Sequence, residues 1–93
     1  MDVIRQAEVV GRIKTDLESL MGSRMKLRAN MGRSKIMERE CVLQETHPSL
    51  FVLTVQEKRE RTARVSYSYV DILTGSVELS HPDSGESLFP WMN

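Results

Sequence analysis

The chain lacks the patterns that mark secreted and membrane proteins. It has one cysteine, Cys41, so it cannot form an internal disulfide, which excludes a disulfide-stapled secreted scaffold. No apolar run approaches the roughly 20 residues of a membrane-spanning helix. Residues 1–5 do not have the basic and apolar regions of a signal peptide. We therefore expect a cytoplasmic protein with no membrane partner.

Catalytic patterns are also scarce. The five glycines are scattered rather than gathered into a phosphate-binding loop, and neither paired cysteines nor a His-Glu-x-x-His zinc motif occurs. His47 and His81 each stand beside a proline, a placement typical of surface turns. Cys41 and a distant histidine would make a nucleophile and base, but an apolar stretch favours a cysteine that acts as a small hydrophobic residue. We expect no enzyme, no cofactor and no metal.

The charges are balanced in number but not in position. Residues 1–39 hold nine Lys/Arg and five Asp/Glu, whereas residues 40–93 hold four and eight. The asymmetry indicates either an acidic partner or two halves that neutralise each other on folding. A length of 93 residues favours one domain.

The first 22 residues predict an amphipathic helix of about five turns, with Asp2 as its N-cap and Gly22 as a left-handed C-terminal cap. Its apolar residues recur at steps of three and four, which places them on one face. These residues are Val3, Ile4, Ala7, Val10, Ile13, Leu17, Leu20 and Met21.

The helix face has two possible partners. It can cover the rest of its own chain, or it can pack on a second subunit in a homodimer. The tail at residues 88–92 is apolar and has the same two alternatives. Candidate residues for a dimer interface are Val10, Ile13, Leu17, Phe89 and Trp91.

After the helix, the period of the apolar residues changes from 3.6 to 2, which predicts strands. We expect turns at residues 31–33, 47–49 and 58–60, and a bulge near Arg39-Glu40 that bends the second strand. The strand at 50–55 is apolar on both faces, which favours a position between two others. The expected strands cover residues 25–30, 34–46, 50–55, 64–69 and 76–79.

Short strands joined by hairpins tend to curl into a small barrel. The single tight helical turn expected at residues 70–75, before the last strand, is typical of an SH3-like barrel. The prediction is a mainly β fold, with one amphipathic helix before a five-stranded SH3-like barrel. Within one domain, we assign residues 1–22 to the helix, 23–80 to the barrel and 81–93 to a C-terminal tail.

A basic stripe is the main candidate for function. Arg24, Lys26 and Arg28 are two residues apart, so a strand projects all three from one face. Such cations can follow a phosphate backbone, and tyrosines can stack on bases; the alternatives are a solvated strand face and core tyrosines. Candidate residues for nucleic-acid or partner binding are Arg24, Lys26, Arg28, Arg33, Lys35, Arg39, Tyr67 and Tyr69.

Three segments together resemble the Veg family of small proteins from low-GC Gram-positive bacteria. They are residues 22–35, 38–51 and 64–79. The most specific part of the resemblance is RVSYSYxDILT, at residues 64–74.

The resemblance implies an SH3-like barrel and a regulatory role, since the family is associated with stimulating biofilm formation through transcription of matrix genes. Two routes fit such a role. The protein can bind and disable a transcription repressor, or it can contact nucleic acid through the basic stripe. SH3-like barrels serve both purposes, so the fold does not choose between them.

Overall fold

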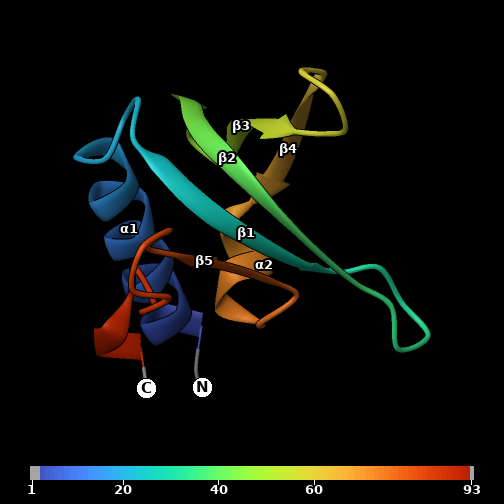
Figure 1. Ribbon diagram of the computed structural model, residues 1–93. Coiled ribbons are helices and arrows are strands. Elements are labelled where there is room, and N and C mark those ends of the chain that lie inside the picture. The colour runs from blue at the N-terminus through green and yellow to red at the C-terminus, as the bar shows by residue number, and fades with distance from the viewer. Residues whose placement is uncertain (1–2, 93) are drawn as a thin grey trace.

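The computed structural model describes residues 3–92 and shows one helix followed by a five-stranded antiparallel sheet (Figure 1). This order confirms the predicted helix, five strands and short helix before the last strand. The elements are α1 (Val3–Glu18), β1 (Arg24–Asn30), β2 (Ile36–Thr46), β3 (Leu50–Gln56), β4 (Thr62–Ser68), α2 (Tyr69–Leu73), β5 (Val77–Ser80) and the 3-10 helix η1 (Pro90–Met92).

Helix α1 is shorter than its apolar pattern predicts, because the chain turns toward β1 after Glu18. Gly22 has the expected positive φ, +80°, but lies in this turn rather than directly behind the helix. Its N–H donates to the Leu43 carbonyl at 2.9 Å, which ties the turn to β2. The predicted cap Asp2 lies outside the described residues.

The strand order is β4-β3-β2-β1-β5. Strand β3 lies between two others, as its apolar faces predict. The bulge in β2 falls at Leu43–Glu45, so the prediction of a bulge at Arg39-Glu40 was wrong. Residues 38–40 pair regularly with β1. The extra residue of the bulge lies farther along, where β2 pairs with β3, and beyond it the side chains of β2 alternate on the opposite faces of the sheet.

Strands β4 and β5 are the two edges of the sheet, and α2 connects them. A capping box begins α2: the Ser68 N–H donates to Asp71 Oδ2 at 3.0 Å, and the Asp71 N–H donates to Ser68 Oγ at 3.2 Å. This cap stops β4 at Ser68. Tyr69, expected in the fourth strand, is therefore the first residue of α2.

The core lies between the inner face of the sheet and the two helices, so α1 covers its own chain. Ile13 and Leu17 are fully buried there. The core residues are Ile13, Leu17, Met25, Leu27, Ala29, Cys41, Leu43, Phe51, Leu53, Val55, Tyr69, Ile72, Val77, Leu79 and Phe89.

The C-terminal tail docks on α1 of the same chain (Figure 1). Phe89 is buried in the core, and Trp91 Nε1 donates to Asp16 Oδ2 at 2.8 Å. The Arg12 guanidinium lies 4.1 Å from the centroid of the Trp91 ring, within the range of a cation–π contact. The tail therefore belongs to the fold.

Three of the five residues suggested for a dimer interface are buried within the chain, namely Ile13, Leu17 and Phe89. They do not face solvent, because the sheet is too small to form a core without α1 and the tail. Val10 and Trp91 are partly exposed.

No helix among residues 3–92 is both long and apolar enough to cross a membrane.

Candidate binding face

Arg24, Lys26 and Arg28 project from the outer face of β1, as their spacing predicts. The register places Glu40 opposite Lys26, and Glu38 opposite Arg28 on β2. On the other side, β5 places Glu78 opposite Arg28. The outer face of these three strands thus alternates cations and carboxylates, and we call its six charged residues the paired-charge face. They are Arg24, Lys26, Arg28, Glu38, Glu40 and Glu78.

Each cation of the paired-charge face has a carboxylate partner. Arg24 Nη2 lies 3.6 Å from Glu40 Oε1, and Lys26 Nζ lies 3.5 Å from Glu38 Oε2. Arg28 bridges two carboxylates, with Nε 3.8 Å from Glu38 Oε1 and Nη1 3.6 Å from Glu78 Oε2. The six side chains are about half exposed, so the pairs add little stability, but together they leave the face without net charge.

The other predicted cations are separate from this face. Arg33 and Lys35 lie in the turn between β1 and β2. Arg33 was expected in this turn, whereas Lys35 was expected in the second strand, which begins one residue later, at Ile36. Arg39 is paired with the core residue Leu27, so it lies on the opposite side of β2 from the paired-charge face. Within residues 3–92, none of these three cations has a carboxylate at ion-pair distance.

The β3–β4 turn repeats the geometry of the β1–β2 turn. In residues 31–35 and 57–61, the first N–H donates to the fifth carbonyl, and the fifth N–H donates to the second carbonyl. The third residue is an arginine with positive φ in both turns, 43° at Arg33 and 52° at Arg59. The fifth residue is a lysine or an arginine. The sequence predicted a turn at residues 58–60, but the cations of this turn were not among the candidate binding residues.

Tyr67 and Tyr69 lie in one aromatic cluster rather than on a free stacking surface. Their ring centroids are 6.2 and 5.6 Å from that of Phe51. Tyr69 is fully buried, and its hydroxyl donates to the His47 carbonyl at 2.6 Å. Tyr67 is partly buried against the core. Of the two rings, Tyr69 is not available for base stacking.

A family model described as "Biofilm formation stimulator VEG" matches residues 8–80. The chain belongs to the VEG family. The match runs from the first half of α1 to the end of β5, so it contains the whole sheet and the paired-charge face and stops before the tail. No curated protein gave a significant match.

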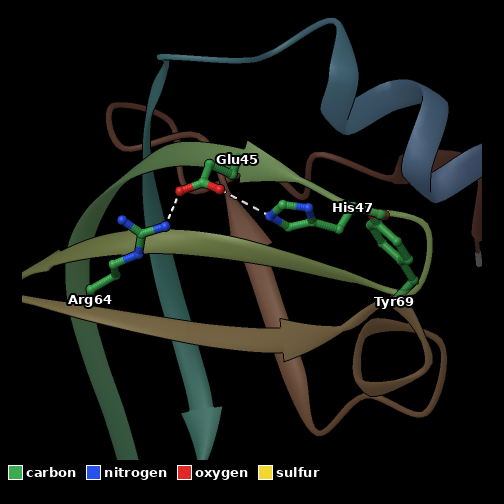
Figure 2. Close-up of polar contacts among 4 residues, drawn as sticks. All are labelled: Glu45, His47, Arg64 and Tyr69. Atoms are coloured by element: carbon green, nitrogen blue, oxygen red, sulfur yellow. Dashed lines mark hydrogen bonds and ion pairs between the residues drawn. The ribbon is translucent and has the colours of Figure 1, made fainter.

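This VEG family member has a second polar cluster, which the bulge in β2 creates. Figure 2 shows Glu45 between His47 and Arg64, with His47 Nε2 3.0 Å from Glu45 Oε1 and Arg64 bonded to Glu45 Oε2. Glu45 pairs with Val52 on the outer face, where Val52 is only 7% exposed. Sequence reasoning missed the cluster because it placed the bulge elsewhere.

Cys41 is not suited to nucleophilic chemistry. It is 3% exposed, and its Sγ donates to the Met25 carbonyl at 3.5 Å. Burial raises the pKa of the Cys41 thiol to about 12, so the thiolate is scarce at neutral pH. Within residues 3–92, no group of three or more His, Cys, Asp or Glu side chains is placed to hold a metal ion.

A groove of about 470 Å³ follows β5 between the paired-charge face and the tail. Arg28 and Glu78 line its polar side, and Leu73, Phe89 and Met92 line its apolar side. The groove therefore runs along one side of the paired-charge face.

Proposed function

We propose that this VEG family member stimulates biofilm formation as a non-enzymatic cytoplasmic regulator. In this proposal it binds another protein, such as a transcription repressor, and thereby influences transcription of matrix genes. The observation that carries the proposal is the paired-charge face, an exposed surface on which each cation already has a carboxylate neighbour.

A mixed-charge surface favours a protein partner over a phosphate backbone. Complementary positive and negative positions select a partner and fix its orientation. Binding to nucleic acid instead draws its affinity from cations that replace condensed counterions. Glu38, Glu40 and Glu78 would repel phosphates at the very positions where Arg24, Lys26 and Arg28 would attract them.

We also infer that the sheet is an SH3-like barrel. The strand order β4-β3-β2-β1-β5 and the one-turn helix between the edge strands support this inference. In such a barrel, the paired-charge face is the outer surface of three neighbouring strands. A strand surface with charges of both signs suits recognition of a folded partner.

The test replaces the charges of the paired-charge face while keeping its shape and the net charge of the chain. The face variant carries all six substitutions together: R24Q/K26Q/R28Q/E38Q/E40Q/E78Q. The matched control, at the β3–β4 turn, is E57Q/K58Q/R59Q/E60Q.

We expect the free energy of unfolding of both variants to lie within about 1 kcal/mol of the wild-type value, because exposed ion pairs contribute little to stability. In a host that lacks its own family member, the control should restore biofilm mass and matrix-gene transcripts, and the face variant should not. The protein that co-purifies with the wild type should survive nuclease treatment and be lost from the face variant. Full stimulation by the face variant would contradict the proposal.

A second candidate function is nucleic-acid binding by the β1–β2 turn together with the first part of β2. It is favoured by Arg33, Lys35 and Arg39, which lack carboxylate partners within residues 3–92. If each cation meets one phosphate, log K should fall with log salt with a slope of about −3. Anisotropy with labelled DNA and RNA measures this slope. R33E/K35E/R39E should then abolish binding, and R24E/K26E/R28E should spare it; absence of binding at low salt rejects this candidate.

A further inference from the structure

The two edge strands of the sheet differ in how the chain covers them. At β5, the outward carbonyl of Leu79 accepts from the Leu88 N–H at 3.0 Å, and the His81 N–H donates to the Glu86 carbonyl at 2.8 Å. Ser80 and Ser87 form a bridge between these two bonds. The tail therefore occupies the C-terminal part of the β5 edge.

Strand β4 has no such cover. The Glu57 N–H donates to the Arg61 carbonyl, and the β3–β4 register continues this pattern to Ala63 and Val65, whose main-chain groups face β3. Main-chain direction alternates along a strand, so Thr62, Arg64 and Ser66 direct their N–H and C=O groups away from the sheet. Ser68 is directed outward in the same way, so four residues of β4 have outward main-chain groups: Thr62, Arg64, Ser66 and Ser68.

Three of these four residues are open to solvent. The Ser68 N–H donates to Asp71 Oδ2, so the capping box of α2 closes that end of the edge. Thr62, Arg64 and Ser66 are exposed, and in the described part of the chain their main-chain groups have no hydrogen-bond partner.

The open stretch of β4 also lacks the usual protection of an edge. It contains no proline, its register with β3 has no bulge, and Arg64 is its one charged side chain. On the inner side, Val65 and Tyr67 are only partly buried because the sheet ends beside them. An added strand would pair the outward main-chain groups and cover these apolar side chains.

We propose that the β4 edge is a self-association site at which a second copy of this chain adds its own β4 in antiparallel orientation. The two-fold axis passes between the Val65 residues of the two copies. Arg64 of one copy then lies opposite Ser66 of the other, and each such pair exchanges two main-chain hydrogen bonds. The result is a dimer with one continuous sheet.

Charge and hydrogen bonding select this register over its neighbours. An axis at Arg64 would set two arginines directly opposite each other, which is unfavourable. An axis at Ser66 would place Arg64 opposite Ser68, whose N–H is already bonded to Asp71. The axis at Val65 keeps the two arginines apart and leaves the two central pairs, Arg64 with Ser66, free of the cap. Only the outermost pair, Thr62 with Ser68, meets the bond to Asp71.

The difference between the edges also favours a closed dimer over a longer assembly. A head-to-tail contact would join β4 of one copy to β5 of the next and generate a ring or a filament. The tail already occupies the end of the β5 edge at Leu79. Among the described residues, β4 has the longer open stretch of edge, and a β4–β4 contact pairs this stretch with itself, so it ends at two copies. This self-association does not depend on the regulatory role proposed above.

Sedimentation equilibrium of the full chain over a wide concentration range tests the proposal. We expect a reversible monomer–dimer equilibrium. Ser66→Pro removes one outward N–H per copy without touching the β3–β4 ladder, and should weaken dimerisation about tenfold or more. Ser66→Ala keeps the N–H and should change the dissociation constant by about twofold or less. Circular dichroism confirms that both variants keep the wild-type fold.

Ser66→Glu tests the register. With the axis at Val65, each new carboxylate lies opposite Arg64 of the other copy. Because Arg64 already bonds Glu45 of its own chain, the dissociation constant should fall by no more than about threefold. With an axis at Ser66, two glutamates would meet and the dimer would weaken, which would overturn the proposed register. A wild type that stays monomeric, or that binds only an extended peptide of another protein at β4, overturns the proposal. A dimer that Ser66→Pro leaves unchanged overturns it as well.

Discussion

At the scale of single residues, Tyr69 joins three parts of the fold. Its ring is fully buried beside Phe51 of β3, and its hydroxyl donates to the carbonyl of His47 in the β2–β3 turn. Tyr69 itself begins α2. One side chain thus ties the β2–β3 turn to the segment that links the two sheet edges.

We expect Tyr69→Phe to lower the free energy of unfolding by about 1 kcal/mol, the usual net value of one hydrogen bond. The ring stays buried, so the loss reflects the hydroxyl alone. Urea denaturation measures it. Tyr67→Phe is the control, because the Tyr67 hydroxyl has no hydrogen bond within residues 3–92. Equal losses in the two variants would contradict the role given to the Tyr69 hydroxyl.

Residue spacing in the sequence predicts some members of the paired-charge face but not all of them. The two-residue spacing of Arg24, Lys26 and Arg28 was enough to predict that they share one face. Glu38 and Glu40 could have been found from the same alternation continued past the hairpin. Glu78 could not, because only the position of β5 in the sheet brings it beside Arg28.

At the scale of elements, the tail is a structural part that the family match does not include. The match ends at residue 80, yet Phe89 is 3% exposed and Trp91 reaches Asp16 of α1. The tail completes the core between α1 and β5. Its sequence pattern left open whether it docks on its own chain or on a neighbour, and packing against α1 gives the answer within the chain.

We expect Phe89→Ala to reduce the free energy of unfolding by about 3 kcal/mol, because it leaves a cavity in the core. Pro90→Ala should change it by less than about 0.5 kcal/mol, since Pro90 is exposed. Thermal or urea denaturation of both variants measures the difference. A negligible effect of Phe89→Ala would mean that the tail does not contribute to the core in solution.

At the scale of the whole molecule, three acids that are buried or partly buried, Cys41, Tyr67 and Tyr69, make stability depend on pH in the alkaline range. Burial raises the pKa of the Cys41 thiol from 9.0 to about 12. Burial is also the main cause that raises the pKa of Tyr67 and of Tyr69 above the ordinary value of 10.0. The unfolded chain releases these protons at a lower pH than the folded chain does.

We therefore expect full stability from these groups below about pH 9 and a steady loss as the pH rises from 9 toward 12. Urea denaturation at pH 7, 9 and 10.5 measures the slope. Cys41→Ala should make the decline shallower, although it also lowers stability at every pH by removing a buried side chain. A free energy of unfolding that stays constant up to pH 10.5 would contradict this expectation.

The sequence by itself determined the helix, the order of the strands along the chain and the positions of the turns. These features depend on residues close to one another, because the helical and strand periods and the turn residues act over a few positions. The segments quoted for the Veg family gave the family correctly. The start of α2 was placed too late, since the capping box overrides the alternation that ends at Tyr69.

Only the tertiary structure decided which charges meet and which apolar residues are buried. The pairs Arg28–Glu78 and Trp91–Asp16 join residues that lie far apart in the sequence. The first contact depends on the position and register of β5 beside β1, and the second on the docking of the tail on α1, which no local period encodes. For this reason, the basic stripe of the sequence became a neutral paired-charge face in the folded protein.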